Sequence, residues 1–136
     1  MDRARETLGS FEGRKRIVRW TDVLQMIDEG RLVIVIDGML VDVTQWLPFH
    51  PGGEKIIPEQ ALRKADCAYW FELYHATRES FELLKELYIG ELDPVDRERL
   101  RDEIDEDEVP SDEFIEQLRE MTHWRLDVGS TIFKSF

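Results

Sequence analysis

Two histidines in this chain have neighbours that suit metal ligands. His50 opens the motif His-Pro-Gly-Gly, in which proline restricts the backbone of the preceding residue and the glycines remove side-chain bulk. His75 follows twenty-five residues later, directly after the aromatic run from Tyr69 to Tyr74. Neutral imidazole is a good iron ligand, and apolar neighbours suit a flat porphyrin. The pair therefore predicts a haem held at both axial positions.

The residues around the two histidines form an ordered set of blocks. In chain order these are the run Leu32–Glu54, then Asp66, Phe71 and His75, and the closing segment Tyr88–Leu92. In this order the stretch 16–92 resembles the cytochrome b5 family. The resemblance implies an α+β fold in which a small mixed sheet carries two helix–loop–helix pairs. These pairs would form a haem crevice, with the histidines in loops that face each other.

The resemblance also implies which residues surround the cofactor, haem b. His50 and His75 would bind the iron. The residues implied to line the haem are Val43, Trp46, Pro51, Gly52, Gly53, Ile57, Phe71, Tyr74, Leu83 and Leu87. Phe71 stands four residues before His75, and an aromatic residue directly precedes that histidine. This arrangement is similar to the b5 domains that are fused to lipid desaturases. Ala76 stands where the family often has a serine that bonds a haem propionate.

Length and charge limit the class of protein. The 136 residues are enough for one domain with extensions and a single hydrophobic core. The formal net charge of −12 disfavours binding to nucleic acid or to anionic membranes and favours partners with basic faces. The other interpretation is that the charge only keeps a small protein in solution, because charge alone does not select a partner.

Cysteine usage and hydropathy exclude further classes. Cys67 is the only cysteine, which excludes an internal disulfide, and we interpret it as a buried, unreactive thiol. A zinc site needs four ligands, and only Cys67 and His123 remain besides the haem pair. The longest apolar run, Leu32–Ile36, is far shorter than the ~20 residues of a membrane span, and the first ten residues lack the apolar core of a signal peptide. We therefore expect a soluble, cytoplasmic protein.

Local signals predict the elements that must position the histidines. Residues 1–15 lack hydrophobic periodicity and are predicted to be a flexible arm, and Ile17–Trp20 is predicted to be an edge strand. Thr21 is predicted to cap the helix that follows, and Asp37-Gly38 to supply the positive φ of a hairpin turn. The remaining elements predicted for the domain are strands over Val33–Ile36 and Met39–Val43 and helices over Glu54–Leu62, Asp66–Tyr74 and Arg78–Tyr88.

Residues 93–136 are predicted to form an acidic, partly helical extension. Asp93-Pro94 is a helix-start signal for a weak helix, and Ser111 is predicted to cap a stronger one. The apolar residues of that second helix are Phe114, Ile115, Leu118 and Met121, with Trp124 close by. A short helix depends on packing for stability, so it must lie on its own domain, on a second copy or on a partner. We favour its own domain; a disordered tail is the remaining interpretation.

A six-coordinate iron has no open position, so it exchanges electrons more readily than it activates oxygen. We interpret the chain as a one-electron carrier, not an enzyme, that works between a flavin-dependent reductase and a redox acceptor protein. The acidic residues predicted to form its docking face are Glu54, Glu59, Asp66, Glu72 and Glu79. One alternative is a haem- or ligand-binding sensor, which the presence of both His50 and His75 disfavours. The other is an accessory module of a larger oxidase or desaturase system.

Overall fold

The computed structural model describes residues 10–45, 59–75 and 77–128, with only the backbone of residues 59, 60, 74 and 75. The strands are β1 (Ile17–Val18), β2 (Val33–Ile36), β3 (Met39–Asp42) and β4 (Tyr88–Leu92). The α-helices are α2 (Trp20–Asp28), α3 (Ala68–His75), α4 (Arg78–Leu87), α5 (Pro94–Leu100) and α6 (Asp112–Met121). Short 3-10 helices are η1 (Glu12–Arg14), η4 (Glu59–Arg63), η5 (Arg101–Glu103) and η6 (Glu106–Glu108). The predicted α+β class is confirmed.

The four strands form a mixed sheet in the order β1-β4-β3-β2. β1 runs parallel to β4, and β3 runs antiparallel to both of its neighbours. The predicted hairpin is present: Asp37 and Gly38 have φ of 54° and 79°, and Ile36 pairs with Met39 across the turn. Of the predicted edge strand Ile17–Trp20, Ile17 and Val18 form β1, and Trp20 is the first residue of α2.

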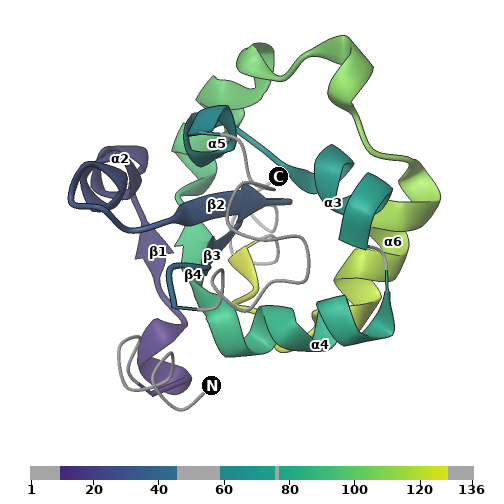
Figure 1. Cartoon of the computed structure of the whole chain (residues 1–136), viewed down its shortest axis with the longest axis horizontal. Coiled ribbons are helices and arrows are strands. Elements are labelled where there is room, and N and C mark those ends of the chain that lie inside the picture. Colours follow the sequence, from purple (N-terminus) through teal and green to yellow (C-terminus); the bar gives the residue numbers. More distant parts are fainter. Residues whose placement is uncertain (1–9, 46–58, 76, 129–136) are drawn as a thin grey trace.

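Both faces of the sheet are buried, and the strand residues divide between two hydrophobic clusters. Met39 and Val41 belong to one cluster with side chains of α4 and α6, whereas Leu40 belongs to a second cluster with side chains of α2. This division follows the alternation of side chains along a strand. In Figure 1, α2 lies on one side of the strands, and α3, α4 and α6 gather on the other. The uninterrupted apolar run of β2 is therefore explained by a sheet covered on both sides.

The N-terminus of α2 is capped by a residue far away in the sequence. Thr21, the predicted cap, is exposed and lies inside the helix. The carboxylate of Asp96, in α5, accepts the backbone N–H of Trp20 at 2.8 Å and the Arg19 guanidinium at 2.9 Å. The prediction that Thr21 caps this helix was wrong. The carboxylate that accepts the N–H of Trp20 belongs to Asp96, which lies 76 residues further along the chain.

Three other predicted helices have different bounds. The helix predicted over 66–74 is α3, which runs from Ala68 to His75. Tyr88 is the first residue of β4, so the predicted helix 78–88 ends one residue early at Leu87. Of the predicted helix 54–62, residues 54–58 lie outside the described residues, and Glu59–Arg63 is a 3-10 helix. The start of α5 is confirmed, since Asp93 accepts the backbone N–H groups of Val95 and Asp96.

Residues 10–15 pack on the domain, although a flexible arm was expected up to residue 15. The Arg14 guanidinium is buried and donates to the backbone carbonyls of Glu86 and Tyr88 at 3.0 and 2.8 Å. The ring of Phe11 lies 6.1 Å from that of Tyr88 and 5.8 Å from that of Trp124. The packing of this segment could not be predicted from hydrophobic periodicity, because it depends on two separate side chains, Phe11 and Arg14.

The C-terminal helix α6 folds back onto its own domain. Ser111 caps it as predicted and accepts the backbone N–H of Phe114 at 3.1 Å. Phe114 and Leu118 are buried in the cluster that contains Phe81 of α4 and Ile36 of β2. Of the three destinations left open by the sequence, the structure shows the first.

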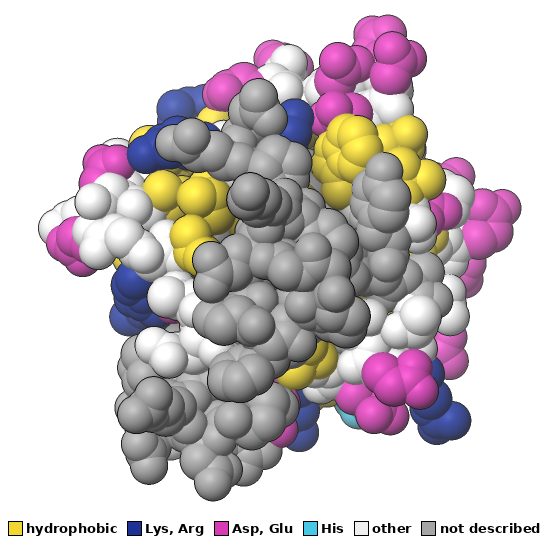
Figure 2. Space-filling view, in the orientation of Figure 1, with side chains coloured by type: hydrophobic (Ala, Val, Ile, Leu, Met, Phe, Trp, Pro, Cys, Tyr) yellow, Lys and Arg dark blue, Asp and Glu magenta, His cyan; other side chains and the backbone are white. Residues whose placement is uncertain are grey.

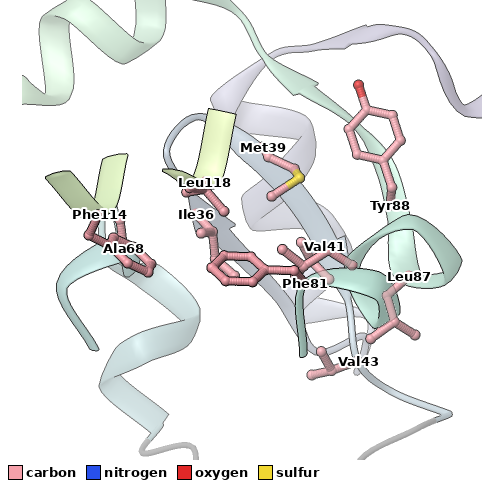
Figure 3. Packing of buried hydrophobic residues seen from close by; sticks show 11 residues of the cluster. Ile36, Met39, Val41, Val43, Ala68, Phe81, Leu87, Tyr88, Phe114 and Leu118 are labelled. Carbon is pink, nitrogen blue, oxygen red and sulfur yellow. The ribbon is translucent and has the colours of Figure 1, made fainter. Parts of the chain in front are cut away.

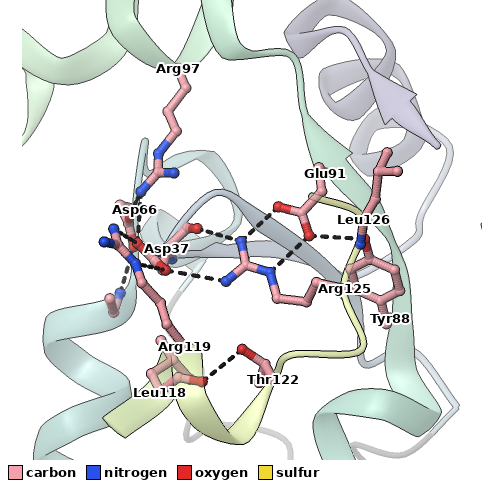
Figure 4. Close-up of polar contacts among 11 residues, drawn as sticks. Asp37, Asp66, Tyr88, Glu91, Arg97, Leu118, Arg119, Thr122, Arg125 and Leu126 are labelled. Atoms are coloured by element: carbon pink, nitrogen blue, oxygen red, sulfur yellow. Dashed lines mark hydrogen bonds and ion pairs between the residues drawn. The ribbon is translucent and has the colours of Figure 1, made fainter. Parts of the chain in front are cut away.

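A network of buried charges fixes the segment after α6 to the sheet (Figure 4). Asp37, at the hairpin turn, accepts hydrogen bonds from Arg97 of α5, Arg119 of α6 and Arg125. Arg125 also donates to both carboxylate oxygens of Glu91, at 2.6 and 2.9 Å. Burial acts to raise the pKa of Asp37, but the hydrogen bond from Arg119 and the charges of Arg97 and Arg125 hold it below its ordinary value. Three arginines thus keep a nearly inaccessible carboxylate ionised.

Replacing Asp96 by Asn tests the long-range cap. We expect the free energy of unfolding at pH 7 to fall by about 1–3 kcal/mol, the range for hydrogen bonds to a charged group. Hydrogen bonds from Arg19 lower the pKa of Asp96 from 3.8 to about 2. Its contribution is therefore complete above pH 4 and is lost as the pH falls towards 2, so the two proteins should converge over that interval. Urea unfolding at several pH values measures this.

The exposed Asp102→Asn variant is the control, because it changes the same charge in the segment after α5. If the difference in unfolding free energy between wild type and Asp96→Asn stays constant from pH 7 to pH 3, the assignment of Asp96 as the cap is contradicted.

Replacing Arg125 by Met tests the buried network. The variant leaves Glu91 without its bidentate partner, and we expect a loss of about 3–5 kcal/mol in unfolding free energy. Adding Glu91→Gln removes the uncompensated charge, so the double variant should recover more than about 1 kcal/mol of that loss. Arg101→Met is the matched control, because Arg101 pairs with Glu98 at the exposed surface and such pairs contribute less than about 1 kcal/mol. If the losses of unfolding free energy in the two single variants simply add in the double variant, Arg125 and Glu91 are not coupled.

Candidate functional site

The candidate site centres on the junction of α3 and α4. α3 ends at His75, and Thr77 caps α4 by accepting the backbone N–H of Ser80 at 3.2 Å. The resemblance implied a loop position for His75; the backbone has it as the last helical residue before a short connection.

Many predicted site residues are not covered by the described part of the chain. His50, Trp46, Ile57 and the motif residues Pro51, Gly52 and Gly53 lie outside it. Tyr74 and His75 are described by their backbone alone. Ligation by the two histidines, and the first of the two helix–loop–helix pairs, therefore stay predictions.

The four described lining residues come together. Val43 and Leu87 are buried, Phe71 and Leu83 are partly buried, and all four belong to the hydrophobic cluster on the α4 side of the sheet. Figure 3 shows Val43 and Leu87 toward one end of this cluster, Phe114 and Ala68 toward the other, and Phe81 between them. The four residues are aliphatic or aromatic, which are the side-chain types that a porphyrin face needs, and we call them the predicted haem wall.

Phe114 is a member of this cluster that the sequence did not assign to the site. The ring centroids of Phe71, Phe81 and Phe114 form a triangle with sides of 5.7, 6.1 and 6.1 Å. One ring comes from α3, one from α4 and one from α6. The apolar stripe of α6 was the available signal, but the stripe identifies a buried face without saying what it contacts.

Cys67 is the buried, unreactive thiol that the sequence predicted. Its backbone N–H donates to the carbonyl of Val35 at 2.6 Å, and its thiol lies 3.4 Å from the carbonyl of Ala61. Burial raises the pKa of the thiol to about 12, so the reactive thiolate is scarce at neutral pH. Among the described residues, no group of three or more His, Cys, Asp and Glu side chains is placed to hold a metal ion.

Two of the five acidic residues predicted to form a docking face are used inside the fold. Asp66 accepts the backbone N–H groups of Asp37 and Ala68, at 2.9 and 2.8 Å. Glu72 accepts both the N–H and the hydroxyl of Ser111. Glu79 is exposed on α4, Glu54 lies outside the described residues, and Glu59 is described by its backbone alone. The prediction was wrong for Asp66 and Glu72 because the sequence does not show internal partners.

The surface of α3 is partly apolar. Trp70 and Leu73 are 36% and 51% exposed, and Figure 2 shows hydrophobic side chains at the surface over this helix. Acidic side chains appear around the edge of the same view. The part of the chain described by the structure contains no helix with the length and apolar character needed to cross a bilayer.

Comparison with known proteins identifies the domain to which these features belong. A family model described as "Cytochrome b5-like Heme/Steroid binding domain" matches residues 19–93. Cytochrome b5 type B of Homo sapiens is 42% identical over 65 residues, 48% of this chain and 42% of that protein. Probable cytochrome b5 1 of Schizosaccharomyces pombe is 38% identical over 81 residues, 60% of this chain and 64% of that protein.

A desaturase is also similar. Acyl-lipid (8-3)-desaturase B of Dictyostelium discoideum is 34% identical over 86 residues, which make up 62% of this chain but 18% of the desaturase. The chain spans less than two thirds of each of these three relatives. The similarity therefore concerns the matched domain and not the whole of any relative.

Proposed function

This chain belongs to the cytochrome b5 family, and on that basis we propose that it carries single electrons between a flavin-dependent reductase and an acceptor protein. Haem b is the cofactor of the family's domain, and the match over residues 19–93 includes both candidate ligands, His50 and His75. The observation that carries the proposal is the wall formed by Val43, Phe71, Leu83 and Leu87 beside the helix that ends in His75. A cytoplasmic location stays a prediction.

The described residues fit the cofactor. The four wall residues are aliphatic or aromatic and lie in one cluster, so they would contact the porphyrin face and exclude water from it. His50 and His75 would hold the iron. When bound, the haem supplies reversible one-electron exchange at iron. The protein's own part is to keep both imidazoles in place and to surround the ring with apolar side chains that limit reorganisation.

Electron transfer is favoured over catalysis by the number of histidines. Two protein ligands leave the iron without an open position for oxygen or substrate. A sensor that binds a small ligand at the iron would need one of these positions free. The chain's family and its two histidines therefore support a carrier more than a catalyst or a sensor.

A second candidate function is an electron-donating module for a lipid desaturase. It is favoured by the similarity to the matched segment of the Dictyostelium desaturase and by the four-residue spacing from Phe71 to His75. Both functions use the same electron-transfer step and differ in the acceptor. Reoxidation of the reduced protein by microsomes, compared with and without an acyl-lipid substrate, separates them. A substrate-dependent increase in the reoxidation rate supports the desaturase role.

The first test of the proposed function replaces the ligands one at a time. In His50→Ala and in His75→Ala we expect an open iron position, so that the reduced protein binds carbon monoxide and the wild type does not. Visible absorption spectra recorded before and after carbon monoxide measure this. His123→Ala is the control, since His123 is an exposed histidine at the end of α6 and should leave the spectrum unchanged. Carbon monoxide binding by the wild type would contradict two-histidine ligation.

The second test concerns the charge of the protein. The net charge of −12 should speed the encounter with a reductase that has a basic face, and salt screens such attraction over about 8–10 Å. We therefore expect the reduction rate to fall at least severalfold between 20 mM and 500 mM salt, as measured by stopped flow. Reduction by photoreduced riboflavin, a donor without net charge, should be nearly independent of salt. A reductase rate that also stays flat would rule out charge-guided docking while leaving electron transfer intact.

A further inference from the structure

We propose that α6 is a positioning element for the haem ligand His75, and that Glu72 and Ser111 are the positioning residues that couple the two. This inference rests on the proposed function, because it assigns to a segment outside the matched domain a role at the haem. The expected consequence is that breaking the contact between Glu72 and Ser111 weakens haem retention and opens the iron, while the fold persists.

The contact itself uses both oxygens of one carboxylate. Glu72 Oε1 accepts the backbone N–H of Ser111 at 2.9 Å, and Oε2 accepts the Ser111 hydroxyl at 2.7 Å. The Ser111 oxygen in turn accepts the N–H of Phe114, which makes Ser111 both the cap of α6 and the partner of Glu72. A carboxylate at this place is also favoured by the partial positive charge at the start of α6. Hydrogen bonds to a charged group are the stronger ones in proteins.

The position of Glu72 along α3 makes this contact relevant to the ligand. Glu72 lies three residues before His75, in the last turn of the helix that His75 ends. Residues three apart lie on neighbouring parts of a helix surface, so fixing one limits the rotation and translation of the turn that carries the other. The contact between Glu72 and Ser111 therefore restrains the last turn of α3, which contains His75.

Phe114 restrains the same region through apolar contact. Its ring lies 6.1 Å from that of Phe71 in α3 and 6.1 Å from that of Phe81 in α4. α3 and α4 are the two helices on either side of His75. A single side chain of α6 thus packs on both.

The other end of α6 is fixed to the sheet. Arg119 donates to both carboxylate oxygens of Asp37, at 3.0 and 3.1 Å, and Arg125 donates to Asp37 and Glu91. α6 therefore joins the hairpin turn of the sheet to the last turn of α3. Motion of α3 relative to the sheet must stretch or break one of these contacts, and this makes α6 a restraint on His75 and not only a cover for the core.

The test uses two variants of Ser111 that both keep a capping oxygen. Ser111→Asp retains a good helix cap but places a carboxylate against Glu72, whereas Ser111→Thr retains the cap and the hydroxyl. We expect Ser111→Asp to transfer haem to apomyoglobin about tenfold faster than wild type, and its reduced form to bind carbon monoxide detectably. Ser111→Thr should resemble wild type. Glu72→Met, which removes both acceptor oxygens, should behave as Ser111→Asp. Glu116→Gln, an exposed charge change on α6, should have no effect.

Thermal unfolding of the haem-free protein, measured beside the haem transfer, separates positioning from general stability. If Ser111→Asp and Glu72→Met transfer haem at the wild-type rate and bind no carbon monoxide, the inference is overturned, even where their melting temperature is lowered. If Ser111→Asp does not fold, Phe114→Leu replaces it, since it loosens the same helix pair and keeps an apolar side chain. A wild-type protein that takes up no haem would instead overturn the proposed function on which the inference rests.

Discussion

The pairing of Arg125 with Asp37 and Glu91 is the interaction on which the arrangement of this protein depends. The two carboxylates lie on the hairpin turn and on β4, and they are 3% and 1% exposed. Buried carboxylates without partners are costly, so the fold needs cations at this place. Arg119 and Arg125 provide two of them, and both lie beyond the family domain. The C-terminal segment is thereby drawn back onto the sheet.

From this constraint the position of the candidate site follows. Once Arg119 and Arg125 are bound, the apolar face of α6 lies on α4, and Ser111 reaches Glu72 on α3. α3 and α4 carry Phe71, Leu83 and Leu87 of the predicted haem wall and the backbone of His75. The sheet, the charges and the C-terminal helix are thus linked to the two helices that flank His75.

Features with local causes could be predicted from the sequence. Asp37-Gly38 specifies its own turn, Asp93-Pro94 its own helix start, and Ser111 its own cap, because each rests on residues a few positions apart. The blocks around His50 and His75 also sufficed for the family and for the mixed sheet. Their number and order made the resemblance specific.

Features with distant causes could not be predicted. Asp96 caps a helix 76 residues earlier, and Glu72 holds a serine 39 residues later, so neither partner is visible in a local window. In the sequence Asp96 is one of many charged residues of a weak predicted helix, and Glu72 was assigned to the predicted docking face. The stripe of α6 predicted a buried face but not its location, because that location depends on arginine contacts with Asp37 and Glu91.

The central claim is that one haem is held by two histidines of this chain. The most direct measurement is electron paramagnetic resonance of the oxidised wild-type protein after addition of one equivalent of haem. The account predicts a low-spin ferric signal typical of two imidazole ligands, with one haem per chain. A high-spin signal, or haem that separates from the protein on gel filtration, would contradict it.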